Sequence, residues 1–555
     1  MRKRIVAAML AVMTLAVAVT GCGGKSGDGN KTNNSAKVEN NCYETGFPIA
    51  QEPVKLTVMV KDDSAGLCDY DNAAITKWIK DEMNIEIEWL TVPGGFEVNN
   101  QATLAFASGN MPDILMGMAP LGYEFYWDYV LEGKLQDLTP YIPTYGPNIV
   151  EMFAKEPLSE YLSTGYDGKV YMLPMVSRND VGEGNSTGRF AYKFYINQTW
   201  LDNLGLAMPT TTAEFKKVLQ AFKDNDPNGN GIPDEVPMEL PEDLPCGLYG
   251  PFGISIYEDK WYLDEDGKVH FAPIEDDYRR ALTYYRDLYQ EGLIGKNFYN
   301  QSMSDISKKL DGAVSTVGAV VCWASDITDY CSLDRAEEYV IVPPLSDELG
   351  NCTWTNQQME TIWPEWFVVT SSCKYPEIAV RLADYFYSLE GSYTAMYGPQ
   401  GEDNLWYLDD DGNVTFTEKK YTEEENGIYA YTPGYPLPHF AGEDYWNAMP
   451  TEDESKLTAL QKYSAKNDDR LVELYSPVIP KNPLPKTKMS LTDMKEANLI
   501  SKDIDDYTWR KKFLLGEASL ENEWDTYIAN MKKMGVDELI QLRQIAYDSY
   551  LEWLK

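Results

Sequence analysis

The sequence predicts an α/β protein, in which an open sheet carries helices on both faces. Alternating, β-branched segments at residues 54–63 and 85–92 enclose a helical pattern at 75–83, which is a β-α-β opening. A chain of 555 residues also suggests two to four lobes, at about 150 residues per domain. We therefore expect more than one unit of this kind.

The next segments continue the alternation of helix and strand. Residues 96–109 predict a helix that ends at Gly109, and residues 111–117 predict a short buried strand. Such a pattern implies a parallel sheet whose ligands lie beyond the carboxyl ends of its strands. Residues 167–175 and 189–197 look extended and lead toward a second unit.

The second unit opens with a helix and contains the first of two similar hairpins. Thr211 and Glu214 have capping-box spacing, which predicts a helix start after Pro209. Residues 261–271 and 406–416 share a hairpin pattern around Asp-Gly. The similarity reflects either matching positions in two lobes or independent use of the same turn chemistry.

The stretch DNDPNGNGIPDEVP, residues 224–237, alternates oxygen-bearing side chains in the register of an EF-hand loop. Pro237 occupies the twelfth position, where an EF-hand has a bidentate Glu, so we expect a structural Ca²⁺ rather than a calcium switch. An ion-free Asn/Asp/Gly turn is the alternative. The expected ligands are Asp226, Asn228, Asn230, the Ile232 carbonyl, Asp234 and Glu235.

The N-terminus predicts export and lipid anchoring. Residues 1–21 combine a basic start with a short apolar run, as in a signal peptide, and the residues before Cys22 resemble a lipobox. We expect Cys22 to carry lipid, palmitate included, with an ordinary signal peptide as the alternative. Residues 22–50 look like a flexible polar tether. The predicted location is the extracellular face of the cell membrane.

Charge and motifs exclude several classes of function. A formal net charge of −39 repels nucleic acid and anionic lipid headgroups, so neutral ligands fit best. The chain has two histidines and none of the GxSxG, HExxH, P-loop or GxGxxG motifs in context, which argues against an enzyme. The cysteines after Cys22 contain no CxxC pair and define no disulfide framework or zinc site.

The aromatic content suits a carbohydrate ligand. The chain has 14 Trp and 39 Tyr against 17 Phe, which favours rings that carry a polar group and can stack on sugars. Core packing is the alternative for each ring, and a solvated strand end is the alternative for the two acids. The candidate ligand contacts are Asp62 and Asp63 at the end of the first strand, Trp127, Trp323, Trp354, Trp363, Trp366 and Tyr435.

Several segments resemble the extracellular solute-binding lipoproteins of bacterial ABC importers, including LAFASGNMPDIL, KLQDLTPYI and WLDNLGLAMPTTTAEF with the acidic loop. The similarity is to the branch of lipoprotein LipO and the alginate-binding proteins, whose layout is like that of maltose-binding protein. It implies two hinged α/β lobes of the type II periplasmic-binding-protein fold, a ligand cleft, and a structural calcium. Asn197-Gln198-Thr199 departs from the Arg-Lys-Asp of many relatives, which suggests a different ligand.

The resemblance also implies lobe boundaries and partners. Residues 51–175 with 366–430 would form the N-lobe, and 190–364 with 431–555 the C-lobe. We expect a monomer that captures a neutral oligosaccharide and delivers it to the transmembrane subunits of an ABC permease. A receptor for peptides or amino acids is the main alternative, and a surface adhesin is a third.

Overall fold

The computed structural model describes most of the chain after residue 37. The described residues are 38–62, 69–93, 96–118, 121, 123–178, 190, 192–241, 244–256, 260–323, 326–355, 362–401, 404–409, 412–417, 437–449, 457–480 and 484–555. Residues 1–37 separate from residues 38–555, and only the second of these units is discussed below. Within the described residues, no helix has both the length and the apolar character needed to cross a membrane.

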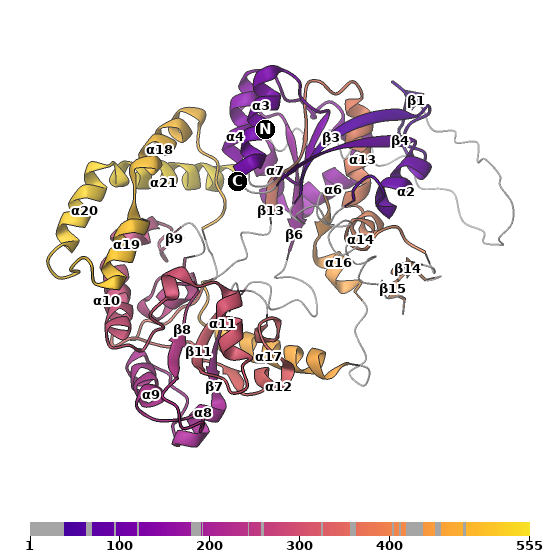
Figure 1. Cartoon of the computed structure of the whole chain (residues 1–555). Helices are drawn as coiled ribbons and strands as arrows, with labels where there is room; N and C mark the ends of the chain where they lie inside the picture. Colours follow the sequence, from indigo (N-terminus) through magenta and orange to yellow (C-terminus); the bar gives the residue numbers. More distant parts are fainter. Residues whose placement is uncertain are drawn as a thin grey trace. The chain divides into compact units, whose positions relative to one another are not determined.

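A six-stranded mixed sheet organises the first lobe, which we define as this sheet and the helices on it (Figure 1). β3 pairs in parallel with β4 and β5, whereas β13 runs antiparallel to β5 and β6. In spatial order the strands are β16 (Phe440–Ala441), β6 (Met172–Ser177), β13 (Ile362–Val369), β5 (Ile114–Met116), β3 (Val54–Asp62) and β4 (Ile85–Pro93).

Alternation along the strands gives this sheet two buried faces. Val58 of β3 belongs to one hydrophobic cluster and its neighbour Met59 to another, because successive side chains of a strand point to opposite faces. Helices α2, α6 and α13 contribute to the first cluster, and α3 and α4 to the second. Helices therefore cover both faces, as the sequence predicts.

A four-stranded sheet organises the second lobe, which we define in the same way. β11 pairs in parallel with β8 and antiparallel with β7, and β12 pairs antiparallel with β7. In spatial order the strands are β12 (Tyr339–Ile341), β7 (Tyr192–Asn197), β11 (Val317–Trp323) and β8 (Val236–Glu239). One large hydrophobic cluster surrounds this sheet and extends into the C-terminal helices.

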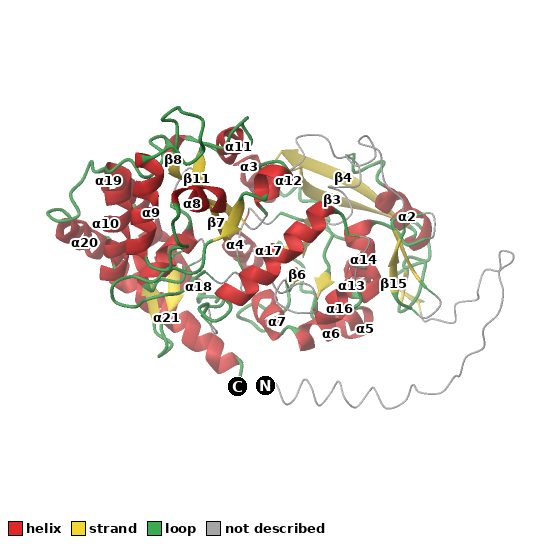
Figure 2. Ribbon diagram, turned by 90° about the horizontal axis from the view of Figure 1, so that it is seen from below, coloured by secondary structure: helices red, strands yellow, loops and turns green. Residues whose placement is uncertain are grey.

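The remaining elements are helices, short 3₁₀ turns and hairpins (Figure 2). The α-helices are α2 (Ala74–Met83), α3 (Phe96–Ser108), α4 (Tyr123–Leu131), α5 (Ile142–Tyr145), α6 (Pro147–Lys155), α7 (Pro157–Ser163), α8 (Gln198–Leu204), α9 (Thr212–Asp224), α10 (Asp276–Gln290), α11 (Met303–Leu310), α12 (Leu333–Ala336), α13 (Pro376–Tyr387), α14 (Leu389–Tyr397), α16 (Glu443–Asn447), α17 (Ala459–Tyr475), α18 (Leu491–Asp503), α19 (Asp506–Leu515), α20 (Trp524–Lys533) and α21 (Val536–Trp553). The 3₁₀ turns are η2 (Cys246–Phe252), η3 (Ala272–Ile274), η4 (Phe298–Asn300) and η5 (Ile327–Asp329), and the remaining strands are β1 (Val38–Glu39), β2 (Cys42–Tyr43), β9 (Trp261–Leu263), β10 (Val269–Phe271), β14 (Trp406–Leu408) and β15 (Val414–Phe416).

The local predictions hold with two changes. The β-α-β opening and both hairpins are confirmed, and Thr211 Oγ1 accepts from the Glu214 amide at 3.1 Å. The Glu214 carboxylate, however, bonds Thr210 rather than completing a capping box with Thr211. The sheets are also mixed rather than parallel, because β13 and β7 run against their neighbours.

The predicted tether does not extend to residue 50. Cys42, Ile49 and Ala50 are fully buried in the first lobe, and the Asn40 side chain donates to Glu377 at 2.7 Å. Phe47 also packs edge-on against Trp78, with ring centroids 5.7 Å apart. Residues 38–50 are therefore part of the fold. The polar composition of residues 23–41 suggests a tether and gives no sign of the apolar groups that residues 38–50 bury.

The six cysteines among the described residues are free thiols: Cys42, Cys246, Cys322, Cys331, Cys352 and Cys373. Burial raises the pKa of the Cys42 thiol to about 12, so that group stays protonated at neutral pH. The described part of the chain thus depends on packing rather than disulfides.

Candidate functional site

The carboxyl ends of the parallel strands define one edge of the first sheet. β3 ends at Asp62 and β5 at Met116. β13 runs the opposite way, with Phe367 opposite Met116, so its first residues, Trp363 to Trp366, extend past the carboxyl end of β5. The Gly117 amide donates to the Trp366 carbonyl at 2.8 Å and fixes this register.

The second sheet has a corresponding edge. The parallel strands β8 and β11 end at Glu239 and Trp323, and the antiparallel strand β7 begins there, with Tyr192 opposite Trp323. Trp323 thus ends a buried strand, as the sequence suggests. In open α/β sheets ligands bind outside the carboxyl ends of the strands.

Two connections join these edges. The chain leaves the first sheet after Ser177 at the end of β6 and enters the second at Tyr192. It leaves the second sheet after Ile341 of β12 and returns at Ile362 of β13. Both connections link one carboxyl edge to the other, so the two edges together are the candidate ligand region.

Aromatic and charged side chains gather at the start of β13. The rings of Trp363 and Trp366 lie 6.2 Å apart, and the Lys486 ammonium lies 5.9 Å from the Trp363 ring centroid. Trp363 is partly exposed, whereas Trp366 is buried and its indole N–H donates to the Leu437 carbonyl at 3.1 Å. Trp363 is therefore the better placed of the two for stacking on a ligand.

Besides Trp366, two further proposed contact residues are buried and lie in the core. Trp127 is 1% exposed and packs against Tyr171, with ring centroids 6.1 Å apart. Trp354 is 2% exposed, and its ring lies so close to Gly247 that a Cβ there would come within 2.5 Å of it. Both residues have loop-like neighbours in the sequence, which give no sign that the two rings are buried.

The structure locates only some of the other predicted ligand contacts. The backbone of Asp62 lies at the first edge and that of Trp323 at the second. Asp63 and Tyr435 lie outside the described residues.

One polar residue at the first edge, Glu365, is not apparent from the sequence as a site candidate. Glu365 lies at a register shift in β13 between Trp363 and Phe367 and is 7% exposed. Tyr126 of α4 is fully buried, and burial together with the Glu365 carboxylate raises its pKa well above the ordinary value. A carboxylate inside the apolar run of β13 is the one signal that could have indicated this position.

The acidic loop between α9 and β8 folds around its own side chains. The two carboxylate oxygens of Asp226 accept from the Asn230 and Gly231 amides at 3.1 and 2.9 Å. The Asn230 side chain donates to Asp234 at 3.1 Å, and its oxygen accepts from the Ile232 amide at 2.6 Å. Gly229 and Gly231 have φ of +70° and +75°, so the tight turn requires glycine at both positions.

The donor set of this loop fits a hard cation. Glu235 Oε1 is buried without a hydrogen-bond partner among the described residues, and burial with the nearby Asp234 and Asp226 raises the Glu235 pKa. Acidic side chains alone do not form a metal-holding group in the described part of the chain. The amide oxygens of Asn228 and Asn230 and the Ile232 carbonyl would have to complete the coordination.

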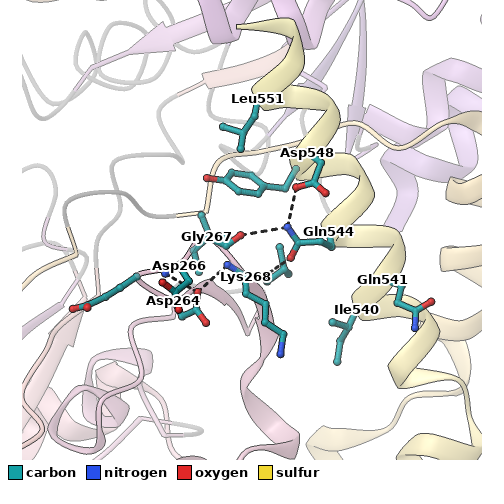
Figure 3. A pocket seen from close by; sticks show the side chains of 13 residues that line it. Asp264, Asp266, Gly267, Lys268, Ile540, Gln541, Gln544, Asp548 and Leu551 are labelled. Carbon is teal, nitrogen blue, oxygen red and sulfur yellow. Dashed lines mark hydrogen bonds between the residues drawn. The ribbon is translucent and has the colours of Figure 1, made fainter. Parts of the chain in front are cut away.

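A separate hollow lies between the β9–β10 hairpin and α21 (Figure 3). The Gln544 side chain occupies its wall, where it accepts from the Val269 amide at 2.8 Å and donates to the Gly267 carbonyl at 3.3 Å. Its amide nitrogen also donates to Asp548 at 3.0 Å. These bonds tie the hairpin to the helix, so this hollow is a packing interface away from the strand edges.

Comparison with known proteins places the chain among bacterial binding proteins. Residues 69–392 match the family model for bacterial extracellular solute-binding proteins. The fructooligosaccharide ABC transporter substrate-binding protein FusA of Streptococcus pneumoniae is 25% identical over 98% of this chain and 97% of its own. Lipoprotein LipO of Bacillus subtilis is 29% identical over 58% of this chain and 56% of its own.

Solved structures agree at the level of the fold. FusA in complex with kestose superposes with a TM-score of 0.74 and 24% identity, over 90% of this chain and all of FusA. The alginate-binding protein AlgQ2 without calcium gives a TM-score of 0.67 and 19% identity, over 92% of this chain and all of its own. These neighbours share the two-lobed α/β fold. The chain therefore belongs to the bacterial extracellular solute-binding protein family.

Proposed function

We propose that this protein is the substrate-binding component of an ABC importer that captures a neutral oligosaccharide outside the cell. The supporting observation is that two chain connections link the two strand edges: Trp363, Glu365 and the backbone of Asp62 lie at the first edge, and Trp323 ends a strand at the second. Flat rings pack against the C–H faces of sugars, and carboxylates accept from their hydroxyls. FusA, which matches nearly the whole chain, binds fructooligosaccharides.

The importer supplies the other parts of this function. The loaded protein would dock on the transmembrane subunits of a permease, and partner subunits would hydrolyse ATP. We assign no catalytic step to this chain. Lipid on Cys22 would hold the protein, as a monomer, at the extracellular face of the membrane. The lobe bounds expected from the sequence, 51–175 with 366–430 and 190–364 with 431–555, would shift. Residues 38–50 pack into the first lobe, and β13 from Ile362 and β16 to Ala441 belong to its sheet.

We also propose that the acidic loop holds a structural Ca²⁺. The ligands would be the six groups expected from the sequence, Asp226 to Glu235, with the buried Glu235 oxygen among them. An EF-hand mutant of FusA has been studied, which fits a cation loop in this family. The bound ion would neutralise the Asp226 and Asp234 carboxylates, which together with burial raise the pKa of Glu235.

Calorimetric titration of the mature, soluble protein tests the ligand class. The panel consists of kestose, nystose, maltotriose, a galacturonate trimer and a peptide mixture. We expect saturable binding of at least one neutral oligosaccharide and no binding of peptides. Tight peptide binding without carbohydrate binding would establish the peptide-receptor alternative instead.

A further inference from the structure

The C-terminal helix α21 is bound to the second lobe near its middle. The Gln544 side chain accepts from the Val269 amide at 2.8 Å and donates to the Gly267 carbonyl at 3.3 Å, both in the β9–β10 hairpin (Figure 3). The Arg543 guanidinium lies 5.3 Å from the centroid of the Trp261 ring. The hairpin belongs to the hydrophobic cluster around the second sheet, so these contacts hold the helix to that lobe.

The end of the same helix is bound to the first lobe. The ring centroids of Tyr550 and Trp553 each lie 5.2 Å from that of Tyr161. Tyr161 of α7 is 3% exposed and belongs to the hydrophobic cluster of the first sheet. Because α21 is unbroken from Val536 to Trp553, the distance from Gln544 to Trp553 is fixed, at about 14 Å for a rise of about 1.5 Å per residue. The helix is therefore a link of constant length between the lobes.

The contact on Tyr161 lies close to the place where the chain leaves the first lobe. Arg178 directly follows β6, at the start of the first connection. It donates to the Glu156 carboxylate at 2.7 Å, and Glu156 directly precedes α7, the helix of Tyr161. The position where the chain departs and the helix that α21 contacts are thus held together.

A second segment, residues 484–489, reaches Tyr161 beside the place where the chain returns. The Lys488 ammonium donates to the Tyr161 carbonyl at 2.5 Å and lies 4.3 Å from the centroid of the Tyr161 ring. Lys486 donates to the carbonyl of Ile362, the first residue of β13, at 3.1 Å. Tyr161 therefore lies near both connections between the lobes.

These contacts restrict how the lobes can move. Two bodies joined by a link of constant length can rotate about its attachment, but they cannot separate there. Hinged lobes close by changes at a few positions while the rest of each lobe moves as a body. Since α21 and both connections meet near Tyr161, this part of the molecule should move least during closure.

We propose that α21 is a strut between the lobes, a helix that keeps the β9–β10 hairpin at a constant distance from α7, and that Tyr161 lies at the pivot about which the lobes close. The strut follows from the contacts alone. Its part in closure on a ligand rests on the proposed function.

Pulsed EPR on the mature, soluble protein tests the pivot with two pairs of nitroxides, attached to p-acetylphenylalanine so that the native cysteines stay unlabelled. One pair replaces the exposed residues Glu265, in the hairpin, and Lys169, after α7. The other replaces the exposed residues Lys77 and Asp202, on helices that pack against β4 and β12, the end strands of the two sheets. On saturation with the best-bound neutral sugar, kestose tested first, the second distance should change roughly three times as much as the first.

Tyr550→Ala combined with Trp553→Ala tests the strut without any ligand. The double variant loses the ring contacts with Tyr161, so the distribution of distances between the first pair of labels should become about twice as wide. Ile545→Ala is the matched control, since Ile545 is on the same helix and 52% exposed, and it should leave the width unchanged. Trp553→Ala alone is the milder variant if the double variant does not fold.

The outcomes separate the strut from the proposed function. An unchanged width in the variants that lack the Tyr161 contacts would overturn the strut. Equal changes of the two distances on ligand binding in the wild type would overturn the pivot. If the wild type binds none of the sugars, the proposed function fails, whereas the widths in the ligand-free protein still test the strut.

Discussion

Burial decides the chemistry of individual residues in this protein. His439, beside β16, is 4% exposed, and burial lowers its pKa from 6.5 to about 4. Trp363 keeps part of its ring accessible at the strand edge, while Trp354 and Trp127 lie in cores. The same residue type thus serves stability in one place and is available to a ligand in another.

Acid should destabilise the protein through His439. Between pH 6.5 and 4 the unfolded chain binds a proton at this histidine and the folded chain does not, so stability falls as the pH falls. The loss approaches about 3 kcal/mol by pH 4, at about 1.4 kcal/mol per pKa unit. Urea unfolding of the wild type and of His439→Gln at pH 7, 5.5 and 4.5 measures this effect. As the pH falls, the variant should lose less free energy of unfolding than the wild type. If the free energy of unfolding of both proteins fell equally with pH, this role of His439 would be ruled out.

Trp323 should contribute to ligand affinity. Its place at the carboxyl end of β11 suits a ring that stacks on a sugar, and Trp323→Ala should weaken binding by roughly 1–3 kcal/mol in calorimetry. Trp261→Phe is the control, because Trp261 packs on Phe271 in the β9–β10 hairpin. That variant should lose stability and keep its affinity. An unchanged affinity in Trp323→Ala would remove this ring from the site.

At the scale of elements, loops and hairpins are fixed by a few polar groups. The acidic loop closes the gap between α9 and β8 with carboxylate and amide bonds, and Gln544 fastens the β9–β10 hairpin to α21. The acidic loop and the Gln544 bonds both lie outside the two strand edges, so changes there should affect stability more than ligand binding.

If the acidic loop holds Ca²⁺ as proposed, removal of the ion should lower the melting temperature and leave ligand preference unchanged. Without the ion, Asp226, Asp234 and Glu235 repel one another at close range. Thermal unfolding in EDTA, followed by addition of Ca²⁺ or Mg²⁺, measures this effect, and Ca²⁺ should restore stability better. Asp234→Asn should reduce the response to EDTA. A change in the ratio of kestose to nystose affinity would instead connect the loop to the ligand site.

Gln544→Ala should loosen the hairpin. The variant loses bonds to the Val269 amide and the Gly267 carbonyl, for a cost of about 1–2 kcal/mol in the free energy of unfolding. Gln541→Ala is the matched control, since Gln541 lines the same hollow on the same helix (Figure 3). Chemical denaturation should distinguish the two variants, and equal stabilities would contradict the role of Gln544.

At the scale of the whole molecule, the C-terminal segment contacts both lobes. The Lys488 ammonium donates to the carbonyls of Tyr161, at 2.5 Å, and Thr164 in the first lobe. Phe513 and Trp524, farther along, belong to the core of the second lobe. Besides the connections between strand edges, this segment also links the lobes, so any hinge motion must accommodate it.

Ligand binding should make the protein more compact. If a sugar contacts both strand edges, it stabilises the state in which they approach each other. Small-angle X-ray scattering should show a smaller radius of gyration with saturating kestose or the best-bound neutral sugar. Trp323→Ala at equal occupancy should show a smaller change. An unchanged radius would indicate a ligand held by one lobe alone.

The sequence by itself determined the α/β class, the first β-α-β unit, both hairpins, the register of the acidic loop and, by resemblance, the family. These features depend on local periodicity and turn chemistry, which neighbouring residues carry. Only the tertiary structure decided that residues 38–50 pack into the fold, that β13 and β7 oppose their neighbours, and that Trp127 and Trp354 are buried. It also brings the Lys488 ammonium to the Tyr161 carbonyl, 327 positions away along the chain. Whether a side chain is buried, and which residues it contacts, depends on distant segments of the chain, so no local sequence pattern predicts it.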